Sequence, residues 1–247
     1  MKQKFNLKKI LIIGFWIGVW QIASLLVGNH IFFVGPVEVT AALLDQCVSW
    51  TFWWTILCSF GKISLGFLAA FALGILIGAL AYAVPVVKEL LEPVILLIKS
   101  VPVASFVILA LIWMGSKNLS VLISFLVVLP MIYVNTVAGL ESADPKLLEM
   151  GQVFHMTMWR KLIFIYRPAL MPYLKSSCRV ALGMSWKSGI AAEVIGVPDY
   201  SIGGELYMAK IYLSTAELFA WTFVVIVISA WFEKLFLFLL DFVDKRF

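Results

Sequence analysis

The chain has 247 residues, of which 63% are hydrophobic and 13% are charged, and its mean hydropathy is +1.02. A soluble domain of this length could not bury so many apolar residues, so the composition excludes a soluble globular protein and predicts an integral membrane protein. The net charge of +5 arises from basic residues beside apolar segments, and it does not require a nucleic acid as partner.

The apolar segments predict helices. A transmembrane helix needs about 20 apolar residues, whereas strands of a membrane barrel would show alternating runs of about ten. We therefore expect an all-α integral membrane protein with six transmembrane helices in a single domain over residues 1–247. An even number of spans places both ends of the chain on the same side. The expected spans are residues 10–27, 63–84, 94–114, 119–140, 177–195 and 218–240.

The first span follows a basic start, as in a signal peptide. No small-residue cleavage site follows it, so we interpret residues 1–27 as an uncleaved anchor. With the N-terminus inside, the cytoplasmic pieces hold 12 basic residues and the outer pieces hold 2, which predicts that both termini are cytoplasmic. The 12 are Lys2, Lys4, Lys8, Lys9, Lys88, Lys146, Arg160, Lys161, Arg167, Lys175, Lys245 and Arg246, and the 2 are Lys117 and Lys210.

The expected extracytoplasmic segments are residues 28–62 and 196–217, and neither is long enough to form a core alone. Cys47, Cys58 and Cys178 lack metal-ligand spacing, and we interpret them as packing residues. A disulfide between Cys47 and Cys58 is compatible with the sequence but nothing requires it. We find no phosphate loop, dinucleotide fingerprint, HExxH motif or nucleophile set, so we expect no catalytic residue, bound cofactor or metal.

Small residues recur at every fourth position of the second span. Gly66, Ala70, Gly74 and Gly78 would lie in one row on a helix, and such rows let two helix backbones approach closely. The row predicts packing within the subunit, or else a seam against another membrane subunit.

Ionisable residues inside expected spans are costly and suggest a function. Lys99 lies in the third span, and Lys187 and Glu193 lie in the fifth. Six residues turn a helix by about 600°, so Lys187 and Glu193 do not share a face, and each should find partners on other helices. Lys99 and Glu193 are a candidate pair between helices. Alternatively, Lys99 and Lys187 line a pathway and attract anions.

A polar segment between two spans carries the best helix-start signals of the sequence. Asp144 is a good N-cap, Pro145 suits the first helical position, and a second short helix can begin at Thr157. Basic residues rim the segment at Arg160, Lys161 and Arg167. Two short helices between membrane spans would form a protrusion that a soluble partner could bind in a groove on its own surface. We expect residues 141–176 to form this cytoplasmic loop.

Within this loop the sequence resembles the motif E-A-A-x(3)-G-x(9)-I-x-L-P of permease subunits in binding-protein-dependent ABC importers. Glu149, Ile165 and Pro168 match in register, and the chain as a whole resembles the nitrate, sulfonate and taurine branch. The supporting segments are FFVGPVEV (32–39), IKSVPVASFVILALIWMG (98–115), NTVAGL (135–140) and AAEVIGVPDYSIGGELYMA (191–209).

The chain also departs from this motif. Met150 and Gly151 replace the two alanines, His155 replaces the glycine and Arg167 replaces the leucine. Histidine tolerates positive φ better than most residues, so we expect the turn between the two short helices to survive.

The resemblance implies a mechanism and a set of partners. Two permease copies, with a homodimer expected, would form the pathway in a bacterial cell membrane. Cytoplasmic ATP-binding subunits would grip the coupling helices, and an extracytoplasmic substrate-binding protein would deliver the substrate. ATP would bind to the partner subunits and not to this chain. The residues expected at the ATPase contact are Glu149, Met150, Gly151, His155, Trp159, Ile165 and Pro168.

Other functions are compatible with a chain of this composition. A secondary transporter should show repeated halves with interrupted helices, and we find no such repeat. A structural membrane protein would leave the capped loop and the membrane charges without a use. The substrate stays open between nitrate, sulfonates, taurine, bicarbonate and thiamine-precursor pyrimidines.

Overall fold

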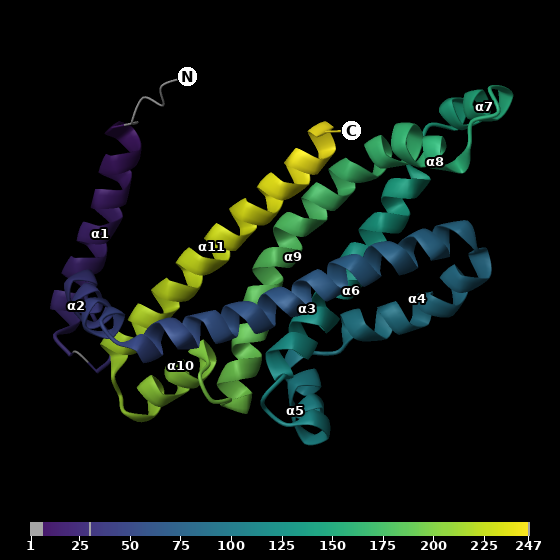
Figure 1. Ribbon diagram of the computed structural model, residues 1–247. Coiled ribbons are helices and arrows are strands. Elements are labelled where there is room, and N and C mark those ends of the chain that lie inside the picture. The colour runs from purple at the N-terminus through teal and green to yellow at the C-terminus, as the bar shows by residue number, and fades with distance from the viewer. Residues whose placement is uncertain (1–6, 30, 247) are drawn as a thin grey trace.

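The computed structural model describes residues 7–29 and 31–246, and every regular element in this part of the chain is a helix (Figure 1). Lys2 and Lys4, which contribute to the predicted orientation, lie outside these residues. The elements are α1 (Leu7–Val27), α2 (Pro36–Cys47), α3 (Trp50–Ala83), α4 (Pro85–Ser100), α5 (Val103–Met114), α6 (Leu119–Glu141), α7 (Pro145–Val153), α8 (Met158–Lys161), η1 (Leu162–Tyr166, a π-helical turn), α9 (Arg167–Gly196), α10 (Ile202–Ile211) and α11 (Thr215–Arg246).

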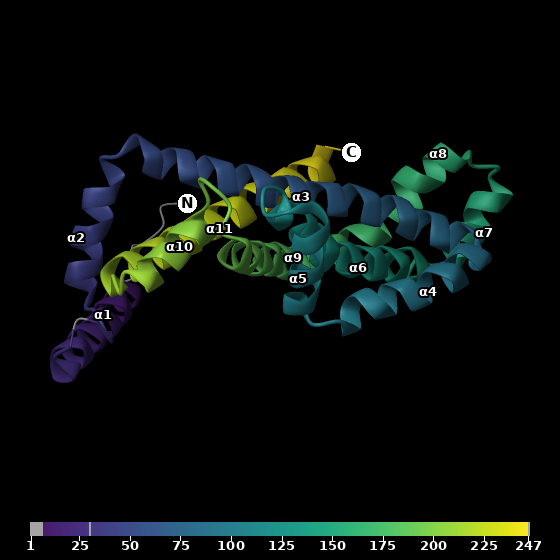
Figure 2. The same cartoon turned by 90° about the horizontal axis from the view of Figure 1, so that it is seen from below.

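The centre of the molecule is formed by α3, α6 and α9, and α11 packs along this group (Figure 1, Figure 2). Phe67 of α3, Ile132 of α6 and Trp186 of α9 are almost fully buried there. Aromatic rings of α11 complete the core, since Phe236 packs edge-on against Phe67 with ring centroids 4.9 Å apart. Burial of side chains of this size supplies most of the packing energy of such a core.

The row of small residues lies inside the subunit, at the contact between α3 and α6. Gly66, Ala70, Gly74 and Gly78 are all buried. A Cβ atom added to Gly74 would lie 2.9 Å from the Cβ atom of Ile132, and one added to Gly78 would lie 2.8 Å from the Cβ atom of Thr136. The two helices therefore need glycine at these positions to approach each other. The prediction of packing within the subunit is confirmed.

The third expected span is not one straight helix. The chain breaks after Ser100, and α4 and α5 are bent against each other by 101°. Pro102 cannot donate a backbone hydrogen bond, and it holds Val101 in an extended conformation with ψ of 130°. The expectation of continuous helix over residues 94–114 was therefore wrong at this proline.

The six-span count stays a prediction. Four helices of the described residues are long and apolar enough to cross a membrane, namely α1, α3, α6 and α11, and the bent pair α4 and α5 would make five. The charged helix α9 is not among them. In addition, α3 begins at Trp50 rather than at residue 63, so residues 50–62, expected in an outer segment, are helical.

The connections gather at two opposite ends of the molecule. The start of α1, the end of α11 and the short helices α7 and α8 lie at the upper side of Figure 1, and α2, α5 and α10 lie at the lower side. This arrangement matches an even number of crossings. It also separates two candidate functional regions, one at each end.

Candidate functional site

The segment with α7 and α8 has the local structure that its sequence predicts. The Asp144 side chain accepts a hydrogen bond from the backbone N–H of Lys146, and Pro145 is the first helical residue. At the other end of α7, His155 has φ of 48°. The N–H of Met156 donates to the carbonyl of Gly151, and that of His155 donates to the carbonyl of Gln152. This is a Schellman motif, which ends a helix at a residue with positive φ. The expected turn at His155 is confirmed.

The interior of this segment is formed by Gly151 and Ile165, both of which are buried. A Cβ atom at Gly151 would lie 3.3 Å from Cδ1 of Ile165 and 3.4 Å from Cε of Lys161. A small residue at 151 therefore lets α7 lie against η1. These two residues lie at the contact between α7 and η1, so their place in this subunit is inside the segment and not at its surface. Pro168 is exposed at the second position of α9.

The remaining residues expected at the ATPase contact are exposed. Glu149, Met150, His155 and Trp159 all reach the surface of this segment. Four further apolar side chains are exposed beside them, and a soluble protein rarely leaves such a patch uncovered unless a partner binds there. These additional residues, which we define with Glu149, Met150, His155 and Trp159 as the α7–α8 patch, are Leu147, Val153, Phe154 and Met158.

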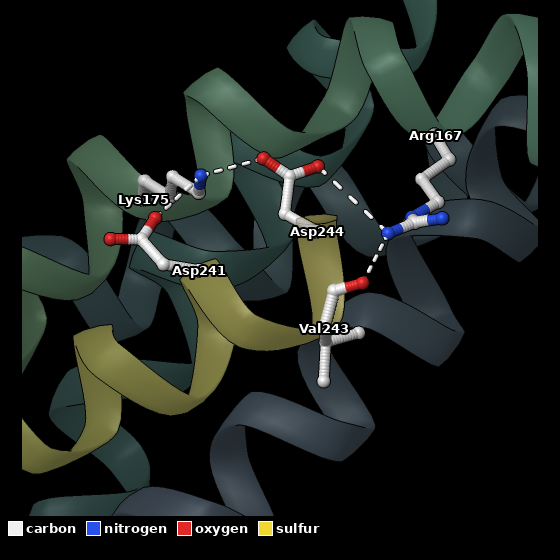
Figure 3. A network of polar contacts seen from close by, with 5 residues as sticks. All are labelled: Arg167, Lys175, Asp241, Val243 and Asp244. Atoms are coloured by element: carbon white, nitrogen blue, oxygen red, sulfur yellow. Dashed lines mark hydrogen bonds and ion pairs between the residues drawn. The ribbon is translucent and has the colours of Figure 1, made fainter. Parts of the chain in front are cut away.

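A network of charges joins the start of α9 to the end of α11 (Figure 3). Nζ of Lys175 lies 2.6 Å from Oδ1 of Asp241 and 2.7 Å from Oδ2 of Asp244. Arg167 donates a hydrogen bond to the carbonyl of Val243, and its Nη2 lies 3.9 Å from Oδ1 of Asp244. Hydrogen bonds from Lys175 to Asp241 and then to Asp244 raise the pKa of the lysine above its ordinary value.

The charge network explains one departure from the family motif. Arg167 stands where the motif has leucine, and in this chain its guanidinium contacts the end of α11. Asp241 and Asp244 were not predicted from the sequence. Their spacing of three residues, which places both on one helix face, was the signal that could have identified them. The network fixes the start of α9, which the short helices precede in the chain, against the end of α11.

Among the membrane charges, the expected pair of Lys99 and Glu193 is absent from the described residues, and this prediction was wrong. Oε2 of Glu193 instead accepts hydrogen bonds from the Ser59 hydroxyl at 2.8 Å and from the N–H of Gly203 at 3.2 Å. Lys99 faces a different cavity, between α4 and α6, together with Glu92 and the ion pair of Lys88 and Glu141. The break between α4 and α5 separates Lys99 from the buried end of α9.

Lys187 lies on the exposed face of α9. No ion pair in the described part of the chain includes it. Arg179, about two turns earlier on α9, is exposed as well. Between these two residues α9 is packed into the core through Leu182 and Trp186. The three cysteines are free, so the disulfide that the sequence allowed is not formed.

Comparison with known proteins matches this architecture to a transport family. The family described as "Binding-protein-dependent transport system inner membrane component" matches residues 70–247. The chain is 26% identical to the taurine transport system permease protein TauC of Escherichia coli (strain K12), over 85% of this chain and 78% of that protein. It is 26% identical to the putative aliphatic sulfonates transport permease protein SsuC of Bacillus subtilis (strain 168), over 87% of this chain and 78% of that protein.

A third relative is the nitrate import permease protein NrtB of Synechococcus elongatus, with 23% identity over 89% of each chain. The family match covers more than two thirds of the sequence, including α6, the α7–α8 patch and the charge network. The helical architecture and the exposed short helices agree with it. This chain therefore belongs to the inner membrane components of binding-protein-dependent transport systems, and it is an ABC importer permease of the nitrate, sulfonate and taurine branch.

Proposed function

We propose that two copies of this chain form the pathway of an importer for a small oxyanion. Two cytoplasmic ATP-binding subunits would bind the α7–α8 patches, and an extracytoplasmic binding protein would deliver the anion. The observation that carries this proposal is the exposed basic face of α9, with Arg179 and Lys187. A charged side chain at membrane depth faces a water-filled route or a protein neighbour and not lipid, which supports a position of Arg179 and Lys187 along the pathway.

Two further observations support an anion as the substrate. The relatives are named for taurine, aliphatic sulfonates, nitrate and bicarbonate, each of which carries a negatively charged oxygen group. On this chain, neither Lys187 nor Arg179 forms an ion pair with the described residues, so each cation is available to an anion. A second copy placed against α9 would enclose the route between two basic faces.

The cytoplasmic partner is supported by the α7–α8 patch. Its apolar side chains surround the exposed Glu149, and this combination suits a groove with a hydrophobic floor and a few polar contacts. The short helix α8 is continuous with α9 through η1, α7 packs against η1 at Gly151, and the network at Arg167 and Lys175 fixes the start of α9. Movement of the ATP-binding subunits would therefore be transmitted to α9.

Reconstitution tests the importer function. The permease is placed in proteoliposomes with the ATPase and the binding protein encoded beside it, with ATP inside and labelled taurine, nitrate or bicarbonate outside. We expect uptake of at least one anion that requires ATP, the ATPase and the binding protein together. Uptake without ATP, driven by an ion gradient, would contradict the proposal and favour a secondary transporter.

Labelling with a membrane-impermeant maleimide tests the proposed orientation, which rests on the basic-residue count. In intact cells, Asp199→Cys should be labelled from outside and Arg160→Cys should be protected. Arg160 belongs to α8 and Asp199 to the connection between α9 and α10, and α8 and α10 lie at opposite ends of the molecule (Figure 1). Both variants are made in a background with Cys47 and Cys58 replaced by serine. Labelling of Arg160→Cys in unbroken cells would show that the orientation is the reverse of the proposed one.

A further inference from the structure

Three segments that are distant in the sequence enclose a cavity of about 420 Å³ at the end of the molecule opposite α7 and α8. They are the first half of α3, the connection between α5 and α6, and the connection between α9 and α10. Two lysines from different segments line this cavity, and neither forms an ion pair with the described residues. The residues that line the cavity include Cys58, Lys62, Ser116, Lys117, Asp199 and Tyr200.

One wall of the cavity is a strained loop. Val197 has φ of 44° and Tyr200 has φ of 50°. Positive φ is unfavourable for a side chain of either type, above all for β-branched valine. Such a conformation persists only where the surrounding structure imposes it, and it is found most often at ligand sites and switches.

The constraint comes from a buried hydrogen-bond network behind the loop. Glu193 is fully buried, and its carboxyl group holds the Ser59 hydroxyl of α3 and the N–H of Gly203 at the start of α10. The Ser59 hydroxyl also accepts a hydrogen bond of 2.9 Å from the N–H of Ile202. At the loop itself, the Ser201 hydroxyl donates to the carbonyl of Pro198 at 2.7 Å. The network therefore joins α3, α9 and α10 and fixes the loop.

The chemistry of the lining suits an anion. Lys62 and Lys117 offer six N–H donors in all, and the hydroxyl of Ser116 adds another. Hydrogen bonds between ionised groups are about twice as strong as neutral ones, and compact oxyanions present several acceptors to them. The positive N-terminal end of α6 begins two residues after Lys117 and adds to the potential. Asp199 carries the opposing charge in the lining, so the three charged side chains sum to one positive charge.

We propose that this cavity is a preorganised binding site for a small oxyanion such as a sulfonate, nitrate or bicarbonate. The anion would bind in this cavity on the outer side first and would then move to the basic face of α9. This role rests on the proposed function, because it assumes that the anion moves from this end towards α9. The hydrogen-bond network fixes the wall that carries Asp199 and Tyr200 before the ligand arrives, which reduces the entropy cost of ordering this wall on binding.

Cys58 lines the cavity and provides a native reporter. The full chain carrying Cys47→Ser is treated in membrane vesicles with two methanethiosulfonate reagents of similar size, one bearing a sulfonate and one a trimethylammonium group. The rate of modification of Cys58 is measured for each. Cys178 is fully buried, and the double variant Cys47→Ser, Cys58→Ser gives the background.

We expect the sulfonate reagent to be favoured, relative to the reactivity of the two reagents with a free thiol. Replacement of both Lys62 and Lys117 by methionine should lower this preference at least about tenfold, because each charge at about 6 Å in a medium between water and protein changes a rate by roughly that factor. The matched variant Asp199→Asn should raise the preference. Nitrate or ethanesulfonate should slow both reagents more than chloride does at the same ionic strength.

An unchanged preference in the double lysine variant would overturn the proposal, as would equal protection by chloride and by the oxyanions. Normal assembly of the double lysine variant, together with a raised preference in Asp199→Asn, excludes misfolding as the cause of a lowered preference. The measurement needs no ATPase and no binding protein. If reconstituted uptake fails while Cys58 keeps its preference, the importer function fails and the anion site stands. If uptake is normal and the preference is missing, this site alone is wrong.

Discussion

Glu149→Arg is expected to abolish substrate uptake while the permease still inserts into the membrane and forms its dimer. Glu149 is exposed on α7 among apolar side chains of the α7–α8 patch, and it has no partner in the described part of the subunit. A carboxylate at such a place can make charge-assisted hydrogen bonds to a bound protein, worth about 1.5–3 kcal/mol. Reversing its charge at a contact that excludes water costs more than removing it. We therefore expect ATPase affinity to fall by at least about tenfold.

Co-purification of the ATPase and uptake in the reconstituted system are measured together. Lys146→Gln is the matched control, because Lys146 is also exposed on α7 and only its backbone N–H is used, in the cap at Asp144. This variant should behave as the unchanged protein does. Normal ATPase binding and normal uptake in Glu149→Arg would show that α7 neither binds the ATPase nor transmits its movement. If the ATPase still binds to Glu149→Arg but uptake is lost, other residues such as Trp159 bind the ATPase, and Glu149 serves to transmit its movement.

Lys187→Met is expected to reduce anion uptake about tenfold or more without loss of assembly. Lys187 is exposed on α9 and has no ion-pair partner within the residues that the structure describes, so its removal leaves no buried carboxylate without a counter-charge. Breaking a buried pair would cost about 3–5 kcal/mol and would destabilise the complex. Loss of a cation that faces the pathway instead weakens the attraction of the anion in a partly desolvated route.

The measurements are the uptake rate against anion concentration and the yield of the intact complex after size-exclusion chromatography. Lys234→Met is a suitable control, because Lys234 is exposed on α11, away from the basic face of α9. It should leave uptake unchanged. If Lys187→Met loses the assembled complex, Lys187 is a structural contact with the second copy. If uptake and assembly both stay normal, α9 does not present this face to the pathway.

Local sequence signals determined the short helices and their ends. The cap at Asp144 and the proline that follows it depend on a few neighbouring backbone groups, so they can be derived from residue types alone. The positive φ at His155 was expected only because the motif that the sequence resembles has glycine there. The row from Gly66 to Gly78 also belongs to this class, because a repeat of four residues fixes one helix face. The sequence by itself could not say which helix covers that face.

Pairing between distant residues was decided by the tertiary structure. The sequence placed Lys99 and Glu193 in the third and fifth expected spans and suggested an ion pair, but Lys99 at the end of α4 faces α6, and Glu193 accepts hydrogen bonds from Ser59 and Gly203. Residue types do not encode which helices pack side by side.

Apolar composition, helical periodicity and capping residues established on their own that this protein is a helical membrane protein with an organised polar segment, because these properties arise from interactions within a few residues or with the solvent. The charge network of Arg167, Lys175 and Asp244, the fixed loop at Tyr200 and the cavity with Lys62 and Lys117 required the fold. Each brings together segments separated by tens of residues or more. Their meeting depends on how α3, α6, α9 and α11 pack, which is a property of the whole bundle and of no single segment.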